Sequence, residues 1–210
     1  SSSLIHRLLT ERQDRDYRLM LTICNLILQR QMPTEEDGLS FISEVERDRL
    51  VLHQLYEKFV ANFYKQHLQN WNVKPQKTLG WHEKTDNLFL PKMKPDLILK
   101  EKTTGKIVIL DTKFTAKSLK ENRWGKEMFN SSHLYQLYTY LGSQEHIASF
   151  QNQASGILLY PAVKDELSET IELPKFQMSI ECVNLANDWE GIEQRLLELI
   201  PYPGHFSNPS

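Results

Sequence analysis

The sequence has only two cysteines, no long apolar run and no charged leader segment, and each absence excludes a class of protein. Cys24 and Cys182 are too few for a disulfide framework in a chain of 210 residues, which favours a reducing, cytoplasmic compartment. No apolar run approaches the ~20 residues that span a bilayer, so we expect no membrane segment. No charged-then-apolar stretch at the start resembles a signal peptide.

Several catalytic and nucleotide-binding signatures are also absent. No glycine-rich loop is followed by Lys-Ser or Lys-Thr, so we expect that the chain does not itself bind a nucleotide triphosphate. The histidine and cysteine spacings match no zinc site, and no serine lies in a nucleophile elbow.

What the sequence does contain is a pair of acids at the ends of a predicted β-hairpin. Two apolar runs, at residues 97–99 and 107–110, are separated by a Thr-Thr-Gly turn; Asp96 precedes the first run, and Asp111 and Lys113 follow the second. Because side chains alternate along a strand, Asp111 and Lys113 share a face. The hairpin therefore brings two acids and a lysine into one small volume, which suits a divalent cation and the attack of water on a phosphodiester.

A lone aspartate at the start of a strand is usually a turn or cap residue. Here, however, Asp96 and Asp111 border strands that are apolar on both faces, where an uncompensated carboxylate costs on the order of several kcal/mol. We therefore interpret both as ligands of Mg²⁺, for which Mn²⁺ could substitute. The Thr112 carbonyl is a further candidate ligand. Lys113 would point its ammonium group at the attacking water or the phosphate. Without the two acids, the expected role of Lys113 would be that of an ordinary lysine at a strand end, with its charged group in solvent.

Three polar residues on predicted helices are further candidates. Gln136 and Tyr140 are four residues apart in a helix predicted over 127–141, so they lie on one side of it and could reach a phosphate or a base. A solvent-facing flank explains this spacing equally well. Glu57 lies at the edge of the apolar stripe of a helix predicted over 45–67. It could turn inward as a third acid and metal ligand, or it could equally be a surface residue.

The spacing of apolar residues predicts alternating helices and strands. We predict helices over residues 17–30, 45–67, 127–141 and 189–200, strands over 79–82, 97–99, 107–110, 156–161 and 177–185, and a basic loop over 114–126. Strands that alternate with helices indicate an α/β fold, with a mixed sheet covered by helices on both faces.

Basic residues gather around the acid pair. Ten basic but only four acidic residues lie between Lys92 and Lys126, so this window is +6 although the whole chain is −2. A polyanionic substrate suits this arrangement, and the loop residues expected to contact its phosphates are Lys117, Lys120, Arg123 and Lys126. The clustering favours nucleic acid, although a solvated charged surface explains scattered lysines equally well.

Two short motifs resemble a known nuclease signature. Pro-Asp at 95–96 with Asp-Thr-Lys at 111–113 is similar to the PD-(D/E)XK motif, and Gln-Leu-Tyr-Thr-Tyr at 136–140 is similar to the Gln-x-x-x-Tyr motif of its RecB-like branch. A longer set of segments resembles, in the same order, the McrC family, the nuclease subunits of McrBC modification-dependent restriction systems. These segments are residues 17–33, 55–59, 90–96, 109–113, 133–141 and 156–161.

The resemblance implies a restriction-endonuclease-like fold with a DNA-cleavage centre. The residues of that centre would be Asp96, Asp111, Lys113, Gln136, Tyr140 and Glu57. McrC-like proteins act with McrB, a GTP-hydrolysing AAA+ hexamer that recognises methylated cytosine, so a McrB-like motor is the implied partner. The chain would be the C-terminal nuclease part, with a helical segment (1–44) that follows an upstream region, a nuclease domain (45–200) and a tail (201–210).

Two other functions are compatible with the sequence. A stand-alone RecB-like exonuclease or junction resolvase would use the same chemistry, and a requirement for DNA ends would distinguish it. A non-catalytic subunit that only activates a GTPase motor is the alternative from another class. The presence of both acids and the lysine argues against that alternative.

Overall fold

The computed structural model describes residues 41–81, 89–114, 119–121, 127–147, 150, 154–162 and 167–200. Side chains are described for these residues except 41–51, 119–121 and 127. The helix predicted over 17–30 and the tail predicted over 201–210 lie outside the described residues.

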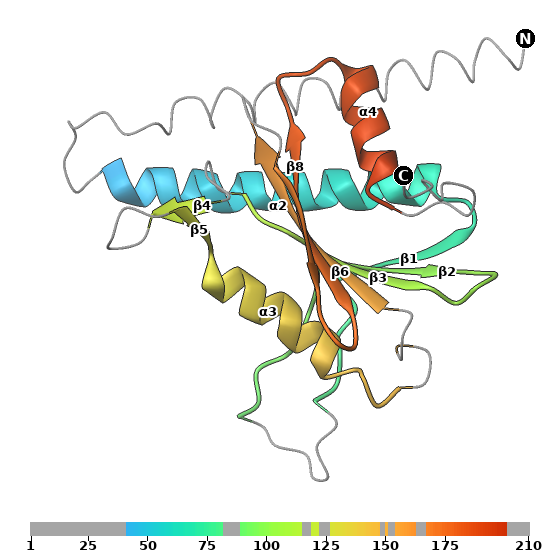
Figure 1. Cartoon of the computed structure of the whole chain (residues 1–210). Helices are drawn as coiled ribbons and strands as arrows, with labels where there is room; N and C mark the ends of the chain where they lie inside the picture. The colour runs from blue at the N-terminus through green and yellow to red at the C-terminus, as the bar shows by residue number, and fades with distance from the viewer. Residues whose placement is uncertain are drawn as a thin grey trace, which may run out of the picture.

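A six-stranded mixed sheet forms the centre of the molecule, in the strand order β1-β2-β3-β6-β8-β7 (Figure 1). The strands are β1 (Trp71–Pro75), β2 (Leu97–Glu101), β3 (Ile107–Thr112), β6 (Ala154–Ala162), β7 (Ser168–Glu172) and β8 (Gln177–Asn184). β6 runs parallel to both β3 and β8, whereas the other neighbours pair antiparallel. The central strands β3 and β6 are buried on both faces, which explains their nearly continuous apolar runs.

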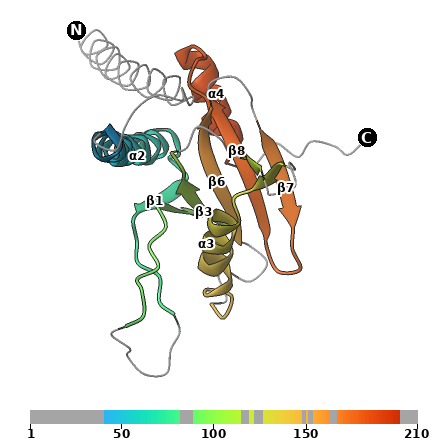
Figure 2. The same ribbon diagram turned by 90° about the vertical axis from the view of Figure 1, so that its left-hand side faces the viewer.

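Helices cover both faces of this sheet. α2 (Phe41–His67) and α4 (Trp189–Glu198) pack on one face, where the Phe59 and Trp189 rings meet edge to face. α3 (Ser131–Gly142) packs on the opposite face against β6, and Figures 1 and 2 show strands between α2 and α3. The predicted fold class, a restriction-endonuclease-like α/β fold with helices on both faces, is confirmed. In the described part of the chain, no helix is long and apolar enough to cross a membrane.

Most predicted elements form within a few residues of their predicted bounds. Both hairpin strands, β6, β8 and α4 are present, and α2 begins at Phe41 rather than at residue 45. The β2–β3 turn is stabilised by Glu101, whose carboxylate accepts hydrogen bonds from Thr103 and Thr104. These bonds, those from Thr104 above all, lower the pKa of Glu101 to about 2.

The loop predicted over 114–126 is wrong in part, because the short strand β4 (Leu119–Glu121) lies within it. β4 pairs with β5 (Glu127–Phe129), so α3 begins later than predicted. Asn130 fixes this start, since its side chain accepts a hydrogen bond from the backbone N–H of Ser132.

The sequence pattern does not predict the two edge strands, β1 and β7. β7 is mostly exposed and does not alternate apolar and polar residues. β1 alternates only from Trp71 to Lys74 and ends at a proline, so its strand pattern is short. Instead of the strand predicted over 79–82, the described residues of this segment form a single antiparallel β-bridge, between Leu79 and Met93.

A close contact between β6 and α3 positions the helix that carries Gln136 and Tyr140. A Cβ atom at Gly156 would lie 2.8–2.9 Å from side-chain methyl groups of Leu137 and Leu141, closer than such atoms normally approach. Leu137 is completely buried, so its side chain has little room to move. The glycine therefore allows α3 to lie directly on the sheet.

We predict that Gly156→Ala destabilises the protein by about 1–3 kcal/mol, because the added methyl group overpacks this contact. Gly142→Ala is the matched control, since its Cβ atom would meet only Tyr138, at 3.9 Å. Urea unfolding of both variants measures the difference. Equal stabilities would show that α3 can shift away from the sheet at no cost.

Candidate active site

The β2–β3 hairpin brings the two predicted acids together at one end of the sheet. Leu97 pairs with Leu110, so Asp96, just before β2, lies beside Asp111 near the end of β3. One oxygen of Asp96, Oδ2, accepts hydrogen bonds from the backbone N–H and the hydroxyl group of Thr112, at 2.7 and 2.6 Å. These bonds leave the second oxygen of Asp96 available to a ligand.

Asp111 is a buried carboxylate with a positive neighbour. Its side chain is 4% exposed, and its Oδ2 atom forms an ion pair with Lys113 Nζ at 2.5 Å. Burial is the largest cause that raises the pKa of Asp111, to about 6, and the charge of Asp96 is the second. The charge of Lys113 lowers this pKa in part. The site therefore concentrates negative charge that the lysine does not fully offset.

α3 places an amide and a hydroxyl group next to Lys113. The Nζ atom of Lys113 donates to Gln136 Oε1 at 2.7 Å, and Gln136 Nε2 donates to the Tyr140 hydroxyl at 2.7 Å. Burial and then the charge of Asp111 raise the pKa of Tyr140, so its hydroxyl group stays protonated. Gln136 and Tyr140 thus face the acid pair and do not form a solvent-facing flank.

α2 brings Glu57 and His53, one helical turn apart, to the same end of the sheet. Glu57 is partly buried. Its pKa is raised mainly by this burial and, to a smaller extent, by the negative charge of Asp96. Its carboxylate accepts a hydrogen bond from the side chain of Gln76, which follows β1. The Nε2 atom of His53 lies 3.0 Å from the Thr112 carbonyl oxygen. The structure therefore places all six predicted catalytic residues at one end of the sheet, although the three acids among them do not form a group that could hold an ion by itself.

Comparison with known proteins identifies the family. Residues 3–161 match the model of the family described as McrBC 5-methylcytosine restriction system component. The chain belongs to this McrBC family. It is also 30% identical over 190 residues to the Type IV methyl-directed restriction enzyme EcoKMcrBC of Escherichia coli (strain K12). That alignment covers 88% of this chain and 53% of the relative, so the chain spans about half the length of the relative.

The McrBC family match contains every residue of the site described above. It ends within β6, so β7, β8 and α4 lie beyond it. The predicted resemblance to McrC proteins is confirmed, because the chain belongs to a family described as a component of the McrBC restriction system.

Sequence reasoning misses three residues that contact this McrBC site, namely His53, Gln76 and Lys94. His53 and Glu57 are four residues apart on a helix, and this spacing could have found His53. Gln76 and Lys94 belong to no periodic pattern, because β1 is not predicted and Lys94 precedes the hairpin strand.

The predicted DNA-binding residues of the basic loop have no described side chains. Lys117, Arg123 and Lys126 lie outside the described residues, and only the backbone of Lys120 is described, in β4. Their contacts with phosphates stay a prediction.

The donor set of the site fits a hard cation such as Mg²⁺. Its candidate ligands are all oxygen atoms, from Asp96, Asp111, Glu57 and the Thr112 carbonyl. Within the described structure, Asp111 Oδ2 accepts only from Lys113, so it keeps a lone pair for a metal. The described residues contain no group of three or more His, Cys, Asp or Glu side chains arranged to hold an ion. An ion here would therefore need the carbonyl, water or a substrate phosphate to complete its coordination, as Mg²⁺ commonly does.

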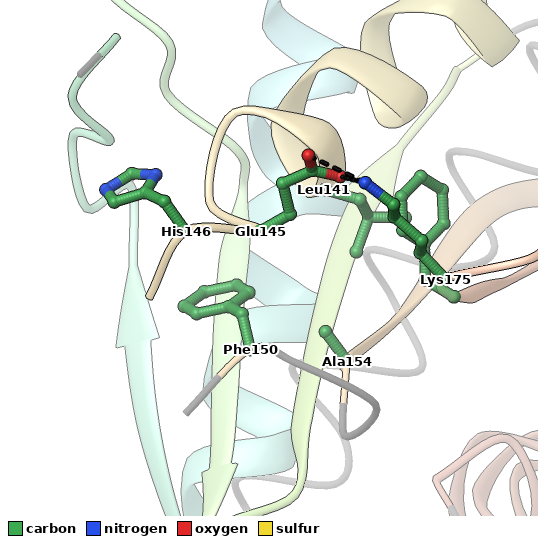
Figure 3. A pocket seen from close by; sticks show the side chains of 7 residues that line it. Leu141, Glu145, His146, Phe150, Ala154 and Lys175 are labelled. Carbon is green, nitrogen blue, oxygen red and sulfur yellow. Dashed lines mark hydrogen bonds and ion pairs between the residues drawn. The ribbon is translucent and has the colours of Figure 1, made fainter. Parts of the chain in front are cut away.

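A separate pocket lies at the opposite end of β6 (Figure 3). Its volume is about 380 Å³, and its lining includes an ion pair between Glu145 and Lys175 at 2.8 Å. Ala154, which lines the pocket, lies at the start of β6. Asp111 of the candidate site pairs with Leu158, which lies about 13 Å from Ala154 along the same strand. No predicted site residue lines the pocket, so it is not part of the candidate active site.

We predict that Lys113→Met raises the pKa of Asp111 above about 6 in the metal-free protein, because the ammonium group that favours the ionised carboxylate is lost. Lys175→Met, which removes a lysine from the distant pocket, should leave this pKa unchanged. NMR titration of the aspartate carboxyl carbons measures both. An unaltered Asp111 pKa in Lys113→Met would mean that the ion pair does not persist in solution.

Proposed function

We propose that this chain is the metal-dependent DNA endonuclease part of a McrBC-type restriction complex. The observation that carries the proposal is the series of contacts from Asp111 through Lys113 and Gln136 to Tyr140, beside Asp96. It gathers two acids, an ammonium group and an amide at one end of the sheet. The description of the relative from Escherichia coli as a methyl-directed restriction enzyme supports the same reading.

The two acids and one backbone oxygen would hold the catalytic metal. Bound Mg²⁺ would supply a Lewis acid that lowers the pKa of a water molecule and polarises the scissile phosphate. Asp96 and Asp111 would bind the ion from neighbouring strands, with the Thr112 carbonyl as a third donor and Glu57 as a further acid. Their placement on a buried hairpin keeps the donor atoms fixed before the substrate arrives.

Lys113 would act on the reacting groups directly. Its ammonium group is held between Asp111 and Gln136, so it keeps one direction. A fixed positive charge can orient the attacking nucleophile or stabilise the charge that develops on the phosphate. Tyr140 supports this arrangement, because its hydroxyl group accepts the second hydrogen bond of Gln136.

The proposed substrate is double-stranded DNA, and the proposed partner is a McrB-like AAA+ GTPase. The window between Lys92 and Lys126 has a net charge of +6, which favours binding of backbone phosphates. Phosphate contacts carry no sequence information, so the choice of target would come from a motor that recognises methylated cytosine. The family description, a component of a 5-methylcytosine restriction system, supports a methylated target for the complex.

We predict that Asp111→Asn reduces DNA cleavage at least about 100-fold without weakening DNA binding, because a metal ligand is lost while the basic residues remain. Glu145→Gln is the matched control, since it also removes one carboxylate but at the distant pocket, and it should cleave normally. The assay uses methylated supercoiled plasmid, Mg²⁺ and a McrB-type partner, and gel mobility reports binding.

Three outcomes would contradict the proposal in different ways. Full activity of Asp111→Asn would refute the catalytic assignment. Cleavage of linear but not of circular plasmid would favour the RecB-like exonuclease. Stimulation of GTP hydrolysis with no DNA cleavage would favour the non-catalytic activator.

A further inference from the structure

The residue that follows β1 has a backbone conformation that is unusual for its type. Gln76 has a φ of 47°, in the left-handed region, and within the described part of the chain it is the only residue other than glycine with a positive φ. A residue with a Cβ atom is strained there, so it persists where the surrounding contacts impose the conformation. The contacts of Gln76 therefore indicate what this conformation achieves.

Both the backbone and the side chain of Gln76 connect parts of the candidate site. Its N–H group donates to the Asp96 carbonyl oxygen at 2.8 Å. Its side-chain amide uses both ends, because Nε2 donates to Glu57 Oε1 and Oε1 accepts from Lys94 Nζ, the latter at 2.8 Å. An amide can donate to a carboxylate and accept from an ammonium group at the same time, which neither a carboxylate nor an ammonium group can do.

We infer that Gln76 is a positioning residue that holds the Glu57 carboxylate near Asp96, so that both acids can serve one cation; this inference rests on the proposed function. Glu57 is part of α2, whereas Asp96 precedes β2, and Gln76 contacts both. The two carboxylates repel each other, and this repulsion contributes to the raised pKa of Glu57. Without the amide donor, the repulsion would turn Glu57 toward solvent.

A purely structural role for Gln76 would be to end β1 and begin the turn that follows. Glycine should then replace it without loss, because glycine adopts a positive φ without strain. If the side chain positions Glu57, Gln76→Gly keeps the turn but loses the bridge. The two roles therefore make opposite predictions for one substitution.

We predict that Gln76→Gly raises the Mg²⁺ concentration needed for half-maximal cleavage about 10-fold or more without lowering the melting temperature. Gln76→Asn keeps an amide and tolerates the positive φ, but it is one methylene group too short to bridge, so it should behave like the glycine variant. Gln194→Asn is the matched control, because Gln194 makes a similar bond to Glu198 on the exposed side of α4. All variants are assayed in the complex with a McrB-type partner.

A double-variant cycle tests whether Gln76 acts through Glu57. In a Glu57→Gln background, Gln76→Gly should have little further effect, whereas independent roles would multiply the two losses. Mn²⁺ binding by the full chain without DNA or partner, measured by calorimetry, gives a readout that needs no cleavage. It should weaken about 10-fold in Gln76→Gly.

Equal Mn²⁺ affinity of Gln76→Gly and the unchanged chain, or losses that multiply in the double variant, would overturn the inference. Failure of the proposed function has a different signature. In that case the unchanged complex would cut no DNA with Mg²⁺ or Mn²⁺, while the Mn²⁺ titration would still decide the role of Gln76.

Discussion

The antiparallel pairing of β2 with β3 is the interaction on which the candidate site depends. Its register sets Leu97 opposite Leu110, so Asp96 and Asp111 lie side by side where the hairpin ends. The hydrogen bonds from Thr112 to Asp96 then fix the first acid to the second strand. A register shift of one residue would turn every side chain of β3 to the opposite face, and Asp111 would no longer face α3.

Both helical layers reach this one end of the sheet, and neither layer forms the site alone. α2 supplies Glu57 from one face, and α3 supplies Gln136 and Tyr140 from the other. The reach of α3 depends on Gly156, since a larger residue there would lift the helix off β6. The packing of Gly156, which pairs with Ile109 two residues before Asp111, therefore decides whether Gln136 can contact the lysine beside the acids.

The part of the site that is local in sequence could be predicted, and the part made by distant contacts could not. Asp96 and Asp111 border one hairpin, whose two apolar runs and turn are visible in the sequence. His53 contacts Thr112 from 59 positions away; the helical spacing could place His53 beside Glu57, but not beside Thr112. Gln76 follows β1, an edge strand of only five residues that ends in a proline, so the pattern that would have placed it is weak. The fold class was predictable because the central strands and the helices have strong apolar patterns.

Two unfavourable features of the described structure lie close together where β3 ends. Asp111 is buried with a raised pKa beside a second acid, and Gln76 is held in a strained backbone conformation nearby. At the other end of the sheet, by contrast, Glu145 and Lys175 form an exposed ion pair that costs little and contributes little. Backbone strain and buried charge persist only where the surrounding contacts enforce them, and such positions cluster at functional sites. The strain and the buried charge near Asp111 thus support the proposed active site on grounds that do not depend on the family match.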